Sequence, residues 1–311
     1  MSSMKRKTQK PPWLRVKFPS GPKYEETRRL IRQGRLHTVC QEACCPNMFD
    51  CFSRHTATFL ILGDHCTREC TFCAVKHGPM QPPDPDEPRR VAEAAAKMGL
   101  TYVVVTSVTR DDLPDGGAGR FAATIAALRR EIADVRVEVL IPDFQGDPEA
   151  LSIVLNARPD ILNHNVETVP RLYSTVRPQA VYQRSLALLA SAARQAGHIP
   201  TKSGMMLGLG ESEAEIRQTL SDLRTAGCRL LTLGQYLQPT PRNHPVVAYV
   251  PPETFEMWRK RALEMGFDEA VAGPFVRSSF QAEETYRKSR SGTIDSSRTI
   301  DDNSLLKPTK Q

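Results

Sequence analysis

Short apolar runs alternate with amphipathic segments along most of this chain, and this alternation limits its possible folds more than any other feature. Apolar and β-branched runs predict strands at 57–62, 102–106, 136–141, 160–164, 204–207 and 230–235. Helical spacing between these runs predicts helices at 91–98, 121–132, 148–155, 181–193 and 213–223. Strands that alternate strictly with helices are typical of parallel βα units. Six units are too few for a closed eight-stranded barrel, so we predict an α/β fold with a partial (β/α)6 barrel.

The cysteines are the second constraint, because seven of the eight fall within residues 40–73. They form two triads, Cys40-x4-Cys45-x5-Cys51 and Cys66-x3-Cys70-x2-Cys73. An even number of cysteines suggests disulfides in a short secreted chain, but this chain is long and no apolar segment follows its basic N-terminus. Metal binding or redox chemistry is therefore the better interpretation of the cluster.

The number of thiols in each triad favours iron over zinc. Structural zinc takes four ligands, and neither triad has an obvious fourth cysteine, although His65 and His77 lie close to the second triad. Iron–sulfur cubanes are held by thiolates, normally four for each cluster. Two sets of three thiols therefore indicate two [4Fe–4S] clusters, each with one iron that no cysteine holds. A zinc site stays open as the alternative.

The x3/x2 spacing, with Phe72 directly before the last cysteine, resembles the motif of the radical S-adenosylmethionine (SAM) superfamily. The resemblance implies that Cys66, Cys70 and Cys73 hold a [4Fe–4S] cluster whose fourth iron binds SAM. It also implies reductive cleavage of SAM to methionine and a 5′-deoxyadenosyl radical, which removes hydrogen from unactivated carbon. The cofactor rather than a side chain supplies such chemistry. The core of this superfamily is a partial barrel of the kind predicted above.

Polar or glycine-rich segments follow several of the predicted strands. Ligand-binding residues of parallel barrels gather beyond the carboxyl ends of the strands, so we predict SAM or substrate contacts from this edge. The candidates are Thr106, Ser107, Asn165, Glu167, Gly208 and Gly210. His164 directly precedes one of them, and we expect it to be a core histidine with satisfied hydrogen bonds.

Blocks spread over nearly the whole chain resemble the lipoyl synthase family. In family order they are CQEACCPNMFDC, ATFLILGDHCTRECTFC, VTSVTRDDLPDGGA, NHNVETVPRLYSTVRP, TKSGMMLGLGE, LTLGQYLQPT and GPFVRSSF. The resemblance extends from about Lys10 to Ala282. It implies insertion of two sulfur atoms, at C6 and C8 of an octanoyl chain on a lysine of a carrier domain, with two SAM molecules used for each lipoyl group.

The same resemblance implies an auxiliary [4Fe–4S] cluster that is itself the source of sulfur. Its ligands would be Cys40, Cys45, Cys51 and Ser279. Ser278 is the weaker candidate for the serine, and Cys44 is an extra thiol that does not fit the x4/x5 spacing. Phe280 stands where the family normally has tyrosine.

The family resemblance also implies partners. These are octanoylated lipoyl carrier domains (the E2 subunits of 2-oxoacid dehydrogenases and the H protein of glycine cleavage), a low-potential electron donor such as flavodoxin or ferredoxin, and an iron–sulfur carrier protein. Residues 1–36 carry a net charge of +9, whereas the whole chain carries +7. The rest of the chain thus has no basic excess that would predict a nucleic-acid groove. We expect the basic arm to attract an acidic partner such as a carrier domain.

No run approaches the roughly 18 apolar residues that cross a bilayer, and we expect neither a membrane partner nor a secretory signal but a cytoplasmic protein. We predict an N-terminal extension with the auxiliary-cluster cysteines at 1–56, the radical SAM barrel at 57–275, a segment closing the auxiliary cluster at 276–288, and a disordered polar tail at 289–311.

Two other functions remain open at this point. One is a radical SAM enzyme that inserts sulfur into a free small molecule, as biotin synthase does. The other is a non-catalytic iron–sulfur or zinc module that carries electrons or binds nucleic acid. Such a module would not need six βα units with polar residues at the strand ends.

Overall fold

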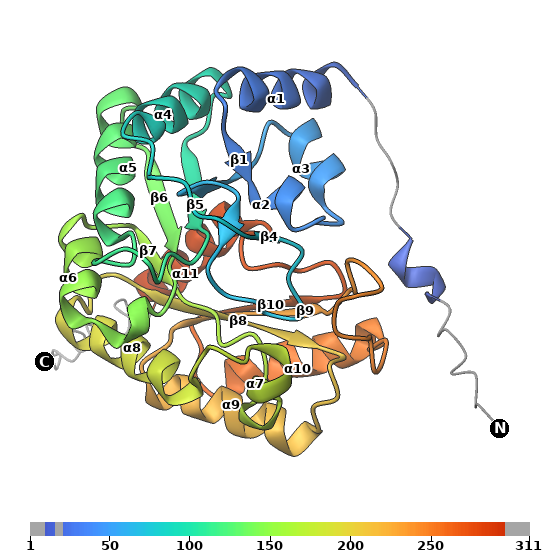
Figure 1. The fold of residues 1–311 in the computed structure, drawn as a ribbon. Coiled ribbons are helices and arrows are strands. Elements are labelled where there is room, and N and C mark those ends of the chain that lie inside the picture. The colour runs from blue at the N-terminus through green and yellow to red at the C-terminus, as the bar shows by residue number, and fades with distance from the viewer. Residues whose placement is uncertain (1–9, 16–20, 296–311) are drawn as a thin grey trace, which may run out of the picture.

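The centre of the structure is an eight-stranded sheet with the order β1-β2-β5-β6-β7-β8-β9-β10 (Figure 1). This computed structural model describes residues 10–15 and 21–295. The strands of the sheet are β1 (His37–Thr38), β2 (Thr58–Ile61), β5 (Tyr102–Ser107), β6 (Arg136–Leu140), β7 (Ile161–Asn163), β8 (Thr201–Leu207), β9 (Leu230–Gln235) and β10 (Glu269–Gly273). Every neighbouring pair is parallel except β1 with β2, so the predicted α/β class and partial barrel are confirmed.

The helices surround the sheet on its outer side, as Figure 1 shows for α4, α5, α6, α8, α9 and α10. The helices are α1 (Pro22–Gln33), α2 (Val39–Glu42), α3 (Met48–Ser53), α4 (Glu87–Lys97), α5 (Ala118–Glu131), α6 (Pro148–Asn156), α7 (Tyr173–Val176), α8 (Tyr182–Gln195), α9 (Glu213–Thr225), α10 (Pro252–Glu264) and α11 (Ala282–Asp295). Short 3-10 turns are η1 (Pro12–Leu14), η2 (Phe144–Gly146) and η3 (Pro170–Leu172). None of the helices in the described part of the chain is both long and apolar enough to cross a membrane.

All six predicted strands and all five predicted helices are present, with ends that differ by a few residues. Local signals explain the clearest of them. Helix α9, for example, begins with a capping box in which Ser212 and Glu215 satisfy each other's backbone N–H groups. Strand β10 and helix α10 lie outside the prediction. The sequence of β10, EAVAG, has a single β-branched residue. In α10, charged residues separate the buried Phe255, Trp258 and Ala262, which stand at helical spacing that the prediction missed.

The N-terminal extension joins the barrel instead of lying apart from it. Its strand β1 pairs with β2, and Tyr24 of α1 stacks on Phe49 of α3 with 5.5 Å between the ring centroids. This contact packs α1 against the short helix that carries Cys51. The extension thereby places the upstream cysteines at the edge of the sheet, beside β2.

Helix α11 packs on the face of the sheet that the outer helices leave uncovered. Side chains alternate between the two faces of a strand. In β5, Val103 and Val105 pack with the outer helices, whereas Tyr102 and Val104 contact α11. The predicted boundary of a disordered tail at residue 289 does not match this helix, because α11 continues to Asp295. The rest of that predicted tail, 296–311, lies outside the described residues.

Beneath α11 a buried ion pair links two strands of the sheet. Lys202 of β8 and Glu138 of β6 are fully buried, with 2.9 Å between Nζ and Oε1. The Tyr102 hydroxyl and the Asn163 amide also donate to the Glu138 carboxylate, at 2.8 Å and 3.2 Å. The four neighbouring strands β5–β8 thus each contribute one side chain to the network, and the buried carboxylate is tolerated because it is paired and hydrogen-bonded.

Replacing Lys202 with Met should destabilise the protein by about 3–5 kcal/mol, because Glu138 then becomes an uncompensated buried charge. Adding Glu138→Gln to this variant should recover most of the loss. Lys97→Met, at the exposed end of α4, is the matched control and should leave stability unchanged. Urea denaturation followed by circular dichroism measures all three variants. Equal midpoints for Lys202→Met and Lys97→Met would contradict the prediction.

Candidate active site

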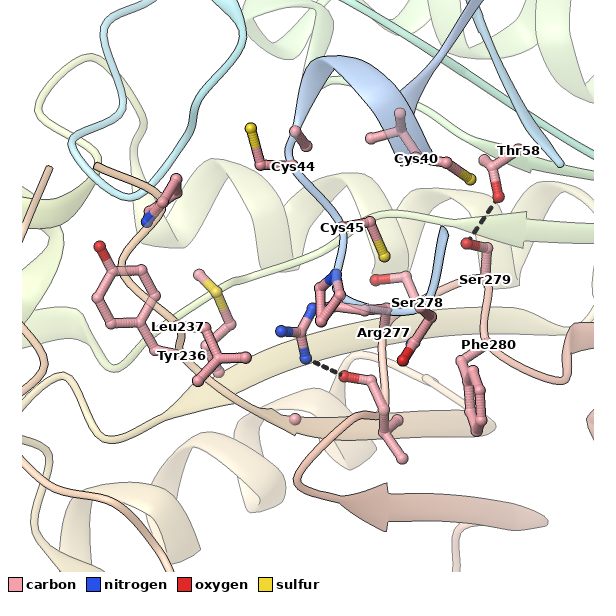
Figure 2. A pocket seen from close by; sticks show the side chains of 18 of the residues that line it. Cys40, Cys44, Cys45, Thr58, Tyr236, Leu237, Arg277, Ser278, Ser279 and Phe280 are labelled. Carbon is pink, nitrogen blue, oxygen red and sulfur yellow. Dashed lines mark hydrogen bonds between the residues drawn. The ribbon is translucent and has the colours of Figure 1, made fainter. Parts of the chain in front are cut away.

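A cavity of about 440 Å³ lies where three distant parts of the chain meet (Figure 2). The N-terminal extension lines it with Cys40, Cys45 and Cys51, and the segment 276–280 lines it from beyond β10. Residues within or just beyond β6, β7, β8 and β9 complete the wall, together with Cys73 of the second triad. Thiols of both triads therefore reach one chamber.

The three upstream thiols lie close enough to influence one another. Cys40 lies in α2, Cys45 in the loop that follows, and Cys51 in α3. Burial raises the pKa of all three thiols, that of Cys51 to about 11, and neighbouring thiolates of the triad raise the pKa of Cys40 and Cys51 further. Ligating thiols must lose their protons, and a metal group supplies the positive charge that makes this possible. This donor set fits an iron–sulfur group.

The second triad begins with Cys66, the last residue of the short strand β3 (His65–Cys66), and continues on the loop to the short strand β4 (Lys76–His77). Burial raises the pKa of the Cys70 thiol and raises that of Cys73 to about 12. The Cys66 sulfur accepts hydrogen bonds from the backbone N–H groups of Arg68 (3.4 Å) and Thr109 (3.3 Å). Hydrogen bonds to the coordinating sulfurs are among the features that tune an iron–sulfur cluster. This triad also has the character of a metal-binding set.

Two side chains that the sequence analysis does not select hold this loop in place. Arg68 is 4% exposed and binds Asp111 through Nε (2.7 Å) and Nη2 (2.9 Å), while Nη2 also reaches Asp143 (2.5 Å). Asn243, in the segment after β9, donates from Nδ2 to the carbonyl oxygen of Cys73 (2.7 Å). Arg68 stands inside the cysteine motif, but its partners lie 43 and 75 residues away, so only the fold reveals them.

The described residues hold no preformed site for a single metal ion. Zinc draws thiolate and imidazole ligands to about 2.0–2.3 Å around a single point. Within residues 10–15 and 21–295, no group of three His, Cys, Asp or Glu side chains converges in this way. In a [4Fe–4S] cubane, by contrast, each thiolate binds a different iron atom. All eight cysteines are free thiols in the structure.

The two adjacent serines after β10 have different partners. Asn165 Nδ2 donates a hydrogen bond to Ser278 Oγ (2.7 Å). Thr58 Oγ1 donates to Ser279 Oγ (2.8 Å), a bond drawn as a dashed line in Figure 2. Ser278 is thereby tied to the segment after β7. Ser279 is tied to β2, whose first residue adjoins Cys40.

Only two of the six residues predicted to bind SAM or substrate line the cavity. Asn165 and Glu167 do so, with 2.9 Å between Asn165 Nδ2 and Glu167 Oε1, and the Asn165 Oδ1 atom has no hydrogen-bond partner within the described residues. Burial raises the pKa of Glu167. The others lie outside the lining, and their roles stay predictions: Thr106, Ser107, Gly208 and Gly210.

Two arginines, Arg177 and Arg277, act on Glu167. Burial lowers the pKa of Arg277, and the negative charges of Cys45 and Glu167 offset part of this lowering. Arg177 donates from Nη1 to the carbonyl oxygen of Asn165 (3.0 Å), and its charge lowers the pKa of Cys70. One guanidinium therefore influences each triad, and both influence Glu167. Both arginines stand in blocks already quoted, but position within a block does not reveal which charges they meet.

His164 is a core histidine, as predicted. Its ring is 1% exposed, and both ring nitrogens have partners, the carbonyl oxygen of Ile141 and the hydroxyl of Ser185, each at 2.9 Å. Burial lowers its pKa to about 4, so the ring is neutral at physiological pH.

Comparison with known proteins agrees with this arrangement. Residues 60–223 match the model of the radical SAM superfamily, and residues 2–45 match that of the N-terminal domain of lipoyl synthase of the radical SAM family. A lipoyl synthase from Caldicellulosiruptor saccharolyticus is 53% identical over 278 residues, which are 89% of this chain and 98% of that protein. The chain belongs to the lipoyl synthase family.

Other lipoyl synthases are similar to the same extent. The protein from Desulfotalea psychrophila is 54% identical, covering 90% of this chain and 93% of its own length. The protein from Trichlorobacter lovleyi is 56% identical, covering 88% and 97%. Among solved structures, methylornithine synthase aligns with a TM-score of 0.51 at 14% identity over 78% of this chain and 69% of that chain. Streptococcus suis SuiB bound to precursor peptide SuiA gives 0.52 at 11% identity, over 72% and 50%. These likenesses concern the fold alone.

Family membership confirms the predicted function, enzyme class and cofactors. Lipoyl synthases are radical SAM enzymes that insert sulfur, and the cofactors are SAM and [4Fe–4S] clusters. The substrate is carried on a lipoyl carrier domain. The two rival functions are set aside, because the close relatives over about nine-tenths of the chain are neither small-molecule enzymes nor non-catalytic modules.

Replacing Arg68 with Lys should loosen the loop of the second triad, because a lysine cannot reproduce the forked contact with Asp111. After anaerobic reconstitution, iron and sulfide should fall from about eight toward about four of each per chain, as one of two cubanes is lost. Arg184→Lys is the control, since Arg184 meets Asp143 through one longer contact of 3.3 Å. Full iron content together with parental SAM cleavage in Arg68→Lys would count against this anchoring role.

Proposed function

We propose that the two triads hold two [4Fe–4S] clusters with different roles in lipoyl synthesis. The SAM-cleaving cluster is assigned to Cys66, Cys70 and Cys73, and the auxiliary, sulfur-donating cluster to Cys40, Cys45, Cys51 and Ser279. One observation carries the proposal: thiols of both triads line the same cavity. A carbon activated from one side of this chamber lies within reach of sulfur on the other side.

The wall between the triads suits an octanoyl chain. When bound, SAM and its cluster supply a radical that removes hydrogen from carbon, and the auxiliary cluster supplies the sulfur. The chain contributes an apolar wall that includes Phe72, Met205, Met206 and Leu237. Such a wall packs against methylene groups and keeps water away from a reactive carbon. Glu167 and Asn165 add polar groups at one side, where we propose that they contact SAM.

Local contacts support Ser279 rather than Ser278 as the fourth ligand. The Ser278 oxygen is engaged by Asn165, on the side of the cavity assigned to SAM. The Ser279 oxygen is held by Thr58, and the Thr58 backbone in turn forms a hydrogen bond with Cys40. A serine oxygen is a harder ligand than thiolate and is less suited to a soft iron–sulfur core. We therefore propose that Ser279 is released when sulfur is transferred.

The finer partners are also proposals. We propose that the substrate is an octanoylated E2 subunit or H protein, that flavodoxin or ferredoxin supplies electrons, and that an iron–sulfur carrier protein rebuilds the auxiliary cluster in the cytoplasm. Residues 1–36, with their net charge of +9, would attract an acidic carrier domain. The described part of this arm includes α1, whose exposed face carries Arg28, Arg29 and Arg32.

Single cysteine replacements should separate the two clusters. Cys70→Ala should abolish reductive formation of 5′-deoxyadenosine and leave about four irons per chain, because the auxiliary cubane still assembles. Cys45→Ala should retain 5′-deoxyadenosine formation and lose lipoyl product. Cys44→Ala, at an exposed thiol outside both triads, should keep both activities. Mass spectrometry of an octanoyl-lysyl peptide and chromatography of 5′-deoxyadenosine give the two readouts. Reductive SAM cleavage by Cys70→Ala would refute the assignment.

Replacing Ser279 with Cys should keep the auxiliary cluster but slow sulfur insertion by about ten-fold or more, because a thiolate is released less readily than an oxygen ligand. Ser279→Ala should assemble a cluster that loses iron more easily. Ser278→Ala serves as the neighbouring control. Iron content and lipoyl product are measured on each variant, and parental values for both Ser279 variants would rule out a ligand role for Ser279.

A further inference from the structure

Thr58 is the residue of the barrel that touches both ends of the proposed auxiliary ligand set. It begins β2, is 6% exposed, and lines the cavity. Its backbone forms a hydrogen bond with Cys40, and its side-chain hydroxyl donates to Ser279 Oγ at 2.8 Å (Figure 2). The first and last members of the set along the chain, Cys40 and Ser279, are thus brought to one strand.

The segment that carries Ser279 depends on such a contact for its position. It runs against β9 at Gly234, where an added methyl group would overlap the carbonyl oxygen of Val276. A turn follows, in which the Phe280 N–H donates to the Arg277 carbonyl oxygen (2.9 Å), and α11 begins at Ala282. These backbone contacts place the segment but leave the serine side chain free to rotate. Within the described residues, Thr58 is the only hydrogen-bond partner of the Ser279 hydroxyl.

The chemistry of two hydroxyls allows this bond to persist whether or not Ser279 is a ligand. A hydroxyl oxygen has two lone pairs, so Ser279 can accept from Thr58 while its oxygen is also bonded to a metal. When the serine is not a ligand, the same pair of hydroxyls remains in contact at the distance seen here. No movement of the backbone is required between these two situations.

We propose that Thr58 is a positioning residue that keeps the Ser279 oxygen beside Cys40 and thereby sets how firmly the fourth iron of the auxiliary cluster is held. The inference rests on the proposed role of Ser279. Partners that orient a metal ligand typically change metal affinity or activity by 10- to 100-fold when they are removed.

The test uses three replacements in the full-length chain. Thr58→Val removes the hydroxyl and keeps the side-chain shape, and Thr58→Ser keeps the hydroxyl. Thr232→Val is the matched control, because Thr232 lies in the same cavity and is 2% exposed, but its hydroxyl faces the Ser203 carbonyl oxygen (3.5 Å). Each is made with Cys66, Cys70 and Cys73 replaced by Ala, so that only auxiliary iron is present. Release of iron to a ferrous chelator is followed by absorbance.

Thr58→Val should lose auxiliary iron about ten-fold faster than the parent, whereas Thr58→Ser and Thr232→Val should match the parent. With the three cysteines restored, Thr58→Val should form less lipoyl product for each SAM cleaved, at an unchanged rate of SAM cleavage. Adding Thr58→Val to Ser279→Ala should have no further effect on iron loss, because the threonine acts through the serine.

The outcomes separate this inference from the assignment on which it rests. Parental iron retention in Ser279→Ala refutes the serine ligand itself. Faster loss in Ser279→Ala with parental retention in Thr58→Val refutes only the role of Thr58. Additive effects in the double variant also refute it, since Thr58 would then act by another route. Equal losses in Thr58→Val and Thr232→Val would indicate general damage to the cavity and overturn the proposal as well.

Discussion

The close approach of the segment 276–280 to strand β9 is the contact on which the arrangement of the cavity depends. Gly234 has no side chain, so the Val276 carbonyl lies directly against the sheet. Gly204 plays the same part on β8, where an added methyl group would lie 2.9 Å from Ser278 Oγ. Larger residues at either position would push the segment away. Arg277, Ser278 and Ser279 would then leave the chamber that the N-terminal cysteines face.

Charge within the chamber is balanced by two arginines that are far apart in the sequence. Arg177 influences Cys70, and Arg277 influences Cys45, while both act on Glu167. Buried thiols with raised pKa values resist ionisation, and nearby guanidinium groups reduce that resistance before iron is bound. Glu167 offsets part of the positive charge. Each triad therefore has its own nearby arginine, and the two arginines are coupled through Glu167.

The scaffold beneath this chamber is held by contacts of a different kind. The buried pair of Lys202 and Glu138 links β8 to β6, and α11 covers it. Because α11 follows the serine segment after only a few residues, its seat on Tyr102 and Val104 also limits where that segment can lie. The charged network beneath α11 and the position of the serine segment in the cavity thus depend on the same helix.

The sequence alone determined the class of fold, the two cysteine triads, and the family. The apolar and amphipathic runs indicate strands and helices because buried positions recur with a short, regular spacing along each element. The triads are visible because cluster ligands are close in sequence, and His164 was correctly expected in the core. What the sequence left open depends on residues that are far apart. Arg68 meets Asp143 across 75 residues, and Thr58 meets Ser279 across 221. The tertiary structure decided these pairs and the different surroundings of Ser278 and Ser279. Adjacent residues of a turn meet different parts of the fold, and no local sequence pattern shows which parts those are.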